Sequence, residues 1–120
     1  MRLLAAFLVG LLTCAPALAA DGNAERGEEI YTRCMACHAL AQNRVGPRHC
    51  GLFGRKAGSG GGYESSDAMK TSGIVWDDKT LADYLKDPKG KVPGTKMVYV
   101  GLKQEAQQQD MIAFLKKATQ

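Results

Sequence analysis

Two cysteines and a histidine stand close together in the segment CMACH, as Cys34, Cys37 and His38. Cysteines at this spacing serve three kinds of chemistry: a structural zinc site, a dithiol redox centre, and covalent attachment of a haem whose iron the histidine binds. Structural zinc needs four ligands. The remaining candidates, His49 and Cys50, are adjacent in the sequence, and this spacing is unfavourable for the second pair of zinc ligands. The segment therefore does not favour zinc.

The residues that precede the motif decide between the other two readings. A thioredoxin-like dithiol follows a strand in a βαβ unit, but no segment rich in Val or Ile precedes Cys34, and the upstream pattern is typical of a helix. On a helix, Cys34 and Cys37 share a face and His38 lies one turn from Cys34, so that all three reach one porphyrin. We therefore predict one haem c, attached through Cys34 and Cys37, with His38 as an iron ligand.

The first residues of the chain indicate export, which suits covalent haem because it is attached outside the cytoplasm. A basic Arg2 precedes an apolar run, and residues 17–19 form an A-x-A cleavage pattern. The run is too short for a spanning helix, which needs about 20 residues. A lipid-modified Cys14 is disfavoured by the preceding Thr13. We expect a cleaved signal over residues 1–20, a single haem domain over residues 21–120, and a periplasmic location.

The composition of the mature chain excludes two other classes of protein. Without Arg2, the chain has 15 basic residues against 12 acidic ones, a net charge of +3. This charge is too mild for a dedicated nucleic-acid binder, which shows a basic run or stripe. The cysteines that remain are Cys34, Cys37 and Cys50, and an odd number does not suit a disulfide scaffold.

An iron bound by His38 has a sixth position to fill. The candidates are His49, Met69, Met97 and Met111. Met111 begins an i, i+3, i+4, i+7 apolar pattern and is better explained as helix core, while Met69 follows a short polar stretch and is more typical of a cap or a packing residue. Met97 lies in KVPGTKMVYVG, where Pro93 and Gly94 indicate a loop that can present a side chain end-on.

Three helices are predicted, with a long irregular stretch between the first two. Residues 23–34 carry apolar positions on one face, with Asn23 as the N-cap. Residues 77–87 show helical spacing that must end near Pro88. Residues 110–120 form the third helix. Residues 39–63 show no periodicity and many glycines. A loop of this length is unusual in a small domain, but it is reasonable if it wraps a large flat cofactor.

These segments together resemble one protein family. CMACH, VGPRHCGLFGRKAG, GIVWDDKTLADYLKDPKGKVPGTKM and DMIAFLKKAT are similar, in this order, to class I cytochrome c of the soluble bacterial and mitochondrial type. The resemblance covers essentially all of residues 21–120. It implies an all-α fold of helices and long loops wrapped around one haem, with His38 as the proximal ligand and Met97 as the distal ligand.

The resemblance also implies roles for residues around the haem. Pro47 would accept a hydrogen bond from the His38 ring, and Tyr84 would lie beside the Met97 sulfur. Arg55 and Trp76 would lie near the propionates. The alternative for each of these is an ordinary turn, core or surface residue.

Four positions, Gly27, His49, Cys50 and Ser65, need separate comment. Gly27 would let the first helix cross closely against the last, as in the family. Ser65 stands where many relatives have a tyrosine facing a propionate, and His49 stands where an apolar haem contact is usual. Cys50 is a free thiol beside His49. We expect His49 to stay unligated, because it is too near Pro47 to reach the face opposite His38.

The function implied is electron transport rather than catalysis, because two protein ligands leave no open position on the iron for a substrate. The alternative is a haem enzyme or gas sensor, peroxidase-like or gas-binding, in which Met97 is displaced. A third possibility is a subunit of one fixed enzyme. The expected partners are acidic surfaces of membrane redox complexes, a bc1-type donor and an oxidase or reaction-centre acceptor, met transiently by a monomer.

Lysines bracket Met97 and predict where such partners dock. They are Lys86, Lys89, Lys91, Lys96 and Lys103. The acidic residues gather elsewhere, at Glu25, Glu28, Glu29, Asp77 and Asp78. This separation predicts a dipolar molecule whose positive side steers acidic partners, although a lysine run is more often only a solvated face.

Overall fold

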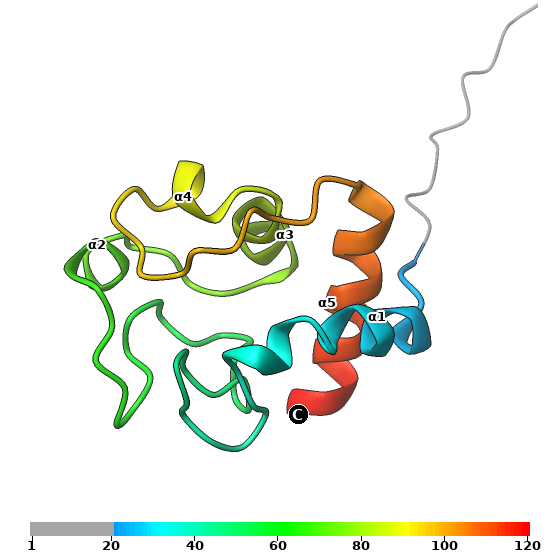
Figure 1. Cartoon of the computed structure of the whole chain (residues 1–120), viewed down its shortest axis with the longest axis horizontal. Helices are drawn as coiled ribbons and strands as arrows, with labels where there is room; N and C mark the ends of the chain where they lie inside the picture. The colour runs from blue at the N-terminus through cyan, green and yellow to red at the C-terminus, as the bar shows by residue number, and fades with distance from the viewer. Residues whose placement is uncertain (1–20) are drawn as a thin grey trace, which may run out of the picture.

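The computed structural model describes residues 21–120, and the predicted signal over residues 1–20 lies outside the described part (Figure 1). The elements follow in the order α1 (Ala24–Tyr31), a 3₁₀ turn (Cys34–Ala36), α2 (Asp67–Lys70), α3 (Asp78–Lys86), α4 (Pro88–Lys91) and α5 (Glu105–Thr119). Among these residues there is no strand, only an isolated bridge between Lys56 and Val75. The predicted all-α class is confirmed.

Helix α1 begins where the sequence predicts and ends earlier. The Asn23 side chain caps it by accepting a hydrogen bond from the Arg26 backbone N–H at 2.8 Å. The α-helix stops at Tyr31, so Cys34 lies in the separate 3₁₀ turn and not on the predicted helix. This turn still brings Cys34 and Cys37 together, because side chains three residues apart eclipse one another in 3₁₀ geometry. Cys34 and Cys37 therefore share a face, as the sequence predicts, but because of a 3₁₀ turn and not because of an α-helix.

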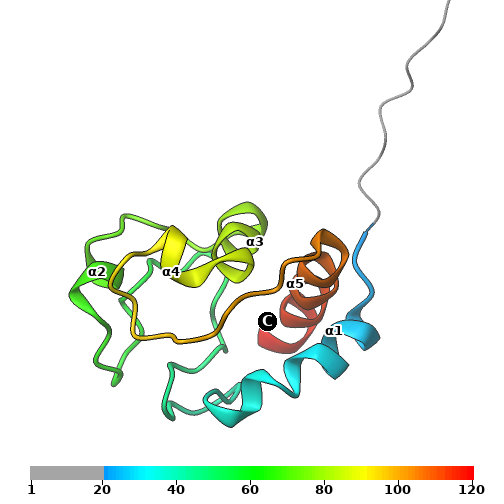
Figure 2. The ribbon, with the colours of Figure 1, turned by 45° about the horizontal axis from the view of Figure 1, so that its top comes forward.

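Helices α1 and α5 cross in direct contact, as Figures 1 and 2 show. Gly27 is the residue that permits this, since a Cβ atom there would lie 2.0 Å from the Asp110 carbonyl oxygen. Helix α5 buries Met111, Phe114 and Leu115, and Phe114 lies at the Gly27 contact itself. The expected close approach of the first and last helices at Gly27 is present.

Helix α3 packs against α5 and begins with a capping box between Asp77 and Thr80. It buries Leu81, Tyr84 and Leu85, the apolar residues that predicted it. The chain then starts the short helix α4 at Pro88, which the sequence did not predict. Proline suits this place because the first helical position needs no N–H donor.

The segment from residue 37 to residue 66 has no helix or strand of its own, and it includes residues 39–63, which the sequence predicts to be irregular. It is held by scattered backbone hydrogen bonds, such as Gly46 N–H to the Cys37 carbonyl at 2.8 Å and Gly51 N–H to the Thr119 carbonyl at 3.1 Å. On the other side, residues 92–104 run as an extended segment from α4 to α5 (Figure 2). These two segments face each other across the interior.

Within residues 21–120, none of the helices has the length and apolar character needed to cross a bilayer.

Candidate functional site

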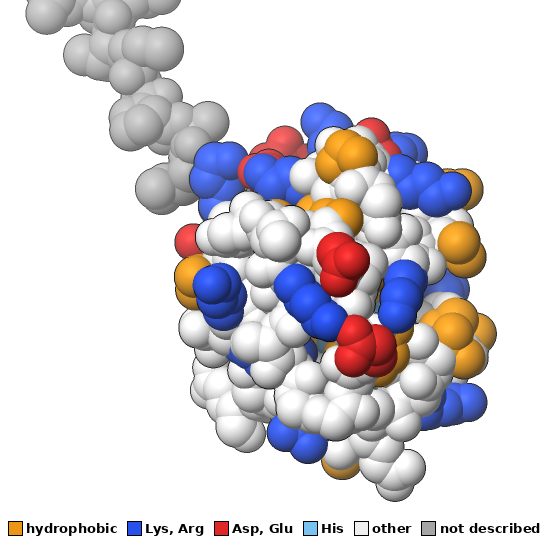
Figure 3. Space-filling view, turned by 90° about the vertical axis from the view of Figure 1, so that its left-hand side faces the viewer, with side chains coloured by type: hydrophobic (Ala, Val, Ile, Leu, Met, Phe, Trp, Pro, Cys, Tyr) orange, Lys and Arg blue, Asp and Glu red, His pale blue; other side chains and the backbone are white. Residues whose placement is uncertain are grey.

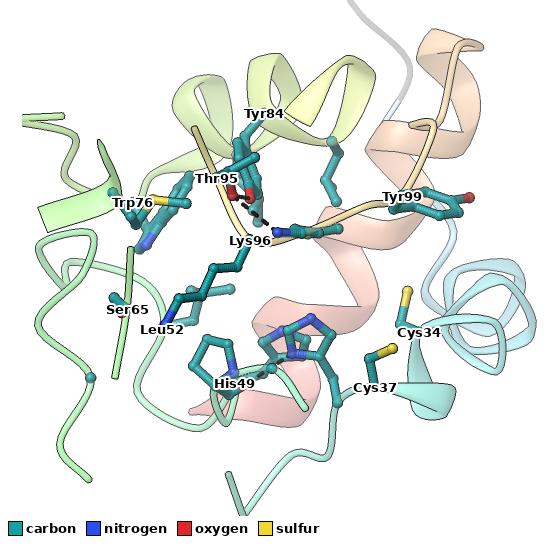
Figure 4. A pocket seen from close by; sticks show the side chains of 18 of the residues that line it. Cys34, Cys37, His49, Leu52, Ser65, Trp76, Tyr84, Thr95, Lys96 and Tyr99 are labelled. Carbon is teal, nitrogen blue, oxygen red and sulfur yellow. Dashed lines mark hydrogen bonds between the residues drawn. The ribbon is translucent and has the colours of Figure 1, made fainter. Parts of the chain in front are cut away.

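A cavity of about 370 Å³ opens between the two irregular segments. Every site residue predicted from the sequence lines it: Cys34, Cys37, His38, Pro47, Arg55, Trp76, Tyr84 and Met97. Figure 4 shows the two cysteines and His49 on one side of this cavity, with Tyr84, Thr95 and Lys96 on the other. The fold thus gathers residues that lie up to 63 positions apart in the chain.

The cysteines and His38 form the first wall, on the turn that follows α1. The His38 backbone N–H donates to the Cys34 carbonyl at 2.8 Å, which fixes the turn. Burial raises the pKa of the Cys34 thiol. Burial also lowers the pKa of His38, although its contact with the Pro47 carbonyl opposes this shift. The lowered pKa favours the neutral imidazole, which is the form that binds a metal.

The orientation of His38 is set by the loop that returns beneath it. Its Nδ1 lies 2.8 Å from the Pro47 carbonyl oxygen, the contact that the resemblance implies. A carbonyl oxygen can only accept, so Nδ1 carries the proton and Nε2 is left with a lone pair for a metal. The backbone of Gly46 passes so near that a Cβ atom there would lie 2.3 Å from His38 Cε1. Glycine is required at this approach.

His49 lies on the same side as His38, not opposite it. The two rings stack with centroids 4.3 Å apart and an interplanar angle of 24°. The Tyr31 hydroxyl contacts His49 Nδ1 at 2.9 Å. Burial, with added repulsion from His38 and Arg55, lowers the pKa of His49 to about 3. This placement agrees with the expectation that His49 does not occupy the sixth position of an iron bound by His38.

The second wall carries the half-buried Met97 on the extended segment. Thr95 supports it through one hydroxyl, which accepts from the Met97 N–H at 3.3 Å and contacts the Tyr84 hydroxyl at 2.8 Å. Lys96 reaches across the cavity mouth and donates to the Glu64 carbonyl at 2.6 Å (Figure 4). The two residues that precede the methionine are thus tied to other parts of the fold.

Arg55, Trp76 and Ser65 line the same cavity beside these walls. The Arg55 guanidinium donates to the Arg48 carbonyl at 2.9 Å and to the Cys50 carbonyl at 3.3 Å, and burial lowers its pKa. Trp76 is buried against Tyr84, with ring centroids 5.2 Å apart. Ser65 is also buried. Polar donors therefore gather on this side of an otherwise apolar space.

Sequence reasoning missed several residues of the site. Met69 and Met111 line the cavity as well as packing in the core. Thr95 was overlooked, although its place two residues before Met97 was a usable signal. Nothing in the sequence indicated that Tyr31, on the last turn of α1, would meet His49.

The donor set fits a covalently held haem. Two thiols three residues apart, an imidazole with a free Nε2, and a thioether on a separate segment all line the cavity. The rest of the lining is largely apolar, with Leu52, Leu81, Leu85 and Leu115 among it. Cofactor sites are generally apolar cavities of roughly 300–1,000 Å³ with a few placed polar groups. The cavity has this character.

Comparisons with known proteins point the same way. Residues 24–119 match the family model described as "Cytochrome c". The chain is 43% identical to the cytochrome c2 of Blastochloris viridis over 110 residues, covering 89% of this chain and 87% of that protein. It is 47% identical to the cytochrome c of Arabidopsis thaliana, covering 82% and 92%. Among solved structures, cytochrome cH from Methylobacterium extorquens matches with a TM-score of 0.78 and 48% identity, covering 80% of this chain and 99% of that one.

Proposed function

Because the chain belongs to the cytochrome c family and carries a haem c attached through Cys34 and Cys37, we propose that it is a soluble periplasmic electron carrier whose iron is bound by His38 and Met97. It shuttles one electron at a time between membrane-bound redox complexes. The observation that carries this proposal is that Met97, on a segment supported by Thr95, lines the same cavity as His38, Cys34 and Cys37.

When bound, haem c supplies one-electron chemistry at its iron, and a thioether ligand raises the potential. The chain's own residues do the rest. His38 presents Nε2 because its Nδ1 is engaged by Pro47. Tyr84 and Thr95 hold the Met97 backbone in place. Leu52, Leu81 and Leu85 exclude water. If His38 and Met97 both bind the iron, no position would be left for a substrate, which would suit electron transfer and not catalysis.

The mouth of the cavity is suited to brief contact with acidic partners. Val45 and Val98 line the cavity and are more than two-thirds exposed, at 73% and 77%. Lys96 lies at the same mouth. Figure 3 shows the face on the α2 side, where several Lys and Arg side chains lie around a few Asp and Glu side chains, with apolar side chains mainly toward one edge. We propose that a bc1-type donor and an oxidase or reaction-centre acceptor dock here, one at a time, with the carrier as a monomer.

Replacing Met97 by Ala tests the ligand assignment. The haem should stay attached, because Cys34 and Cys37 are untouched. The potential should fall, the methionine–iron charge-transfer band at the red end of the spectrum should vanish, and the ferrous protein should bind carbon monoxide.

Met69→Leu is the matched control, since it alters another methionine of the same cavity and should keep the band. A Met97→Ala protein with a native spectrum and potential would show that the ligand assignment is wrong. Carbon monoxide binding by the wild type, with loss of the band, would instead favour the haem enzyme or sensor.

A further inference from the structure

His49 introduces an imidazole at a place where the resemblance leads one to expect an apolar side chain. Its ring stacks on the His38 ring at 4.3 Å, and the planes differ by only 24°. A stacked neighbour at this distance blocks rotation of the His38 ring out of its plane. The Pro47 carbonyl, by contrast, engages only one edge atom of His38, Nδ1. The two contacts therefore restrict different motions of the same ring.

The His49 ring is itself fixed, through Tyr31. The Tyr31 hydroxyl meets His49 Nδ1 at 2.9 Å, and the two rings lie edge to face with centroids 5.6 Å apart. Tyr31 is only 4% exposed and packs against Phe114 of α5, with centroids 5.0 Å apart. A continuous set of contacts therefore runs from the α1/α5 crossing to the face of His38.

The backbone around His49 is also tied to the residues that follow His38. The His49 N–H donates to the Ala39 carbonyl at 3.2 Å, and the Cys50 N–H donates to the Leu40 carbonyl at 2.7 Å. These bonds set the distance between the two histidines. They do not set the rotation of the His49 side chain, which leaves the Tyr31 hydroxyl as the polar contact that does.

We propose that Tyr31 and His49 are positioning residues that fix the plane of the His38 imidazole, with the Tyr31 hydroxyl orienting His49 and the His49 ring orienting His38. The inference rests on the proposed ligation of iron by His38. The plane of an axial imidazole decides how its orbitals overlap those of the iron, so the pair acts on the electronic structure of the site without touching the iron.

Burial keeps the Tyr31 phenol protonated, since it raises the pKa to about 12. A protonated phenol can donate or accept, and His49 Nδ1 is the ring atom that it meets. We assign the hydroxyl as the donor in this contact, which places the imidazole proton of His49 on Nε2. This assignment gives a direct observable. The chain has two histidines, so ¹⁵N-histidine labelling yields signals from two rings only.

The experiment is a double-mutant cycle on the haem-loaded protein with Tyr31→Phe, His49→Leu and the double variant. Three quantities are measured: the tautomer of His49 in the ferrous form, the hyperfine-shifted His38 signals in the ferric form, and the potential. Tyr31→Phe should release the His49 tautomer, move the His38 signals and shift the potential. In the His49→Leu background the same change should have no effect on either the His38 signals or the potential.

Tyr63→Phe is the matched control, because it removes another hydroxyl of a cavity-lining tyrosine, one that donates to the Val45 carbonyl. Any shift it causes should be equal with and without His49. The inference is overturned if Tyr31→Phe leaves the His38 signals in place, or if its effects are as large in the His49→Leu background. Absence of strongly shifted His38 signals in the wild type would instead refute the ligation by His38.

Discussion

The α1/α5 crossing and the two segments that enclose the cavity are built on different principles. At the crossing, the two helices meet directly at Gly27, and Arg26 of α1 pairs with the buried Asp110 of α5 at 2.9 Å. The cavity segments meet mainly through turns and single hydrogen bonds. Every glycine with positive φ in the described chain lies outside α1 and α5.

This contrast indicates what each region needs in order to fold. Helix packing buries side chains of the protein against each other, so the crossing brings its own stabilisation. In the cavity region, buried side chains such as Leu52 and, just before α3, Trp76 line a space of about 370 Å³. Without the cofactor these side chains have few partners, and the chain entropy of the loops is not offset.

The largest expected effect follows from removing the haem attachment. A Cys34→Ala, Cys37→Ala chain produced without haem should be mostly disordered, because the cavity segments lose their common core. Circular dichroism with thermal melting would show a weak helical signal and no cooperative transition. A cooperative melt in this apoprotein would mean that the cavity segments are stabilised by protein contacts alone.

The next effect concerns the crossing itself. Gly27→Val should destabilise the haem protein by about 3 kcal/mol or more, because its side chain would overlap the Asp110 backbone and overpack the contact. Gly61→Ala is the control, since a Cβ atom there meets nothing within 4 Å, and it should change stability by less than about 0.5 kcal/mol. Denaturant unfolding of both variants measures the difference. Equal small effects would show that the helices can separate slightly at no cost.

A smaller effect concerns the ion pair that joins the two helices. Hydrogen bonds from Arg26, and from the Asn23 backbone at 2.7 Å, lower the pKa of Asp110. A lowered pKa in the folded state contributes stability that is present above the unfolded pKa of about 3.9 and is lost as the pH falls through the folded value. Asp110→Asn should therefore cost about 1 kcal/mol at pH 7, with the difference shrinking below about pH 4.

Melting temperatures of wild type and Asp110→Asn between pH 7 and pH 2 check this dependence. Arg26→Lys serves as the comparison, because it keeps a cation but loses the pair of contacts that Arg26 makes with the two Asp110 oxygens, at 2.9 and 3.1 Å. It should show an intermediate dependence. If the melting temperatures of all three proteins fall in parallel as the pH is lowered, Asp110 does not contribute to the pH dependence of stability.

The last prediction concerns surface charge on the two regions. These substitutions should change stability least, and their effect is measured as a change in the electron-transfer rate. Lys96→Glu or Lys103→Glu should slow electron transfer with an acidic partner more than Lys117→Glu on α5, and the wild-type rate should fall as salt rises, since screening acts over about 10 Å at 0.1 M. Lys117 is a better control than Lys116, whose Nζ lies 2.5 Å from Asp78.

Lys96 also donates to the Glu64 carbonyl next to the Met97 segment. The potential of each variant must therefore match the wild type before the rates are compared. If the rates do not depend on salt, or if all three substitutions slow the rate equally, the lysines have no docking role and only form a solvated surface.

By itself, the sequence determined those features that depend on residues close together in the chain. These features are the capping residue Asn23, the helical periodicity of α3 and α5, and the loop character of residues 39–63. Each is a property of a short segment, and the structure has all of them. The haem c prediction follows from five adjacent residues, and it is confirmed by the family match. Such inferences succeed because each depends on residues that are neighbours in the chain.

Only the tertiary structure decided which distant side chains meet. Tyr31 and His49 are 18 residues apart, and Lys96 and the Glu64 carbonyl are 32 apart. No periodicity connects such positions, because the path of an irregular loop is set by many weak contacts and not by a repeating backbone geometry. The sequence therefore identified the two cysteines that hold the cofactor, whereas the packing of α1 on α5 placed Tyr31 beside His49, the residue stacked on His38.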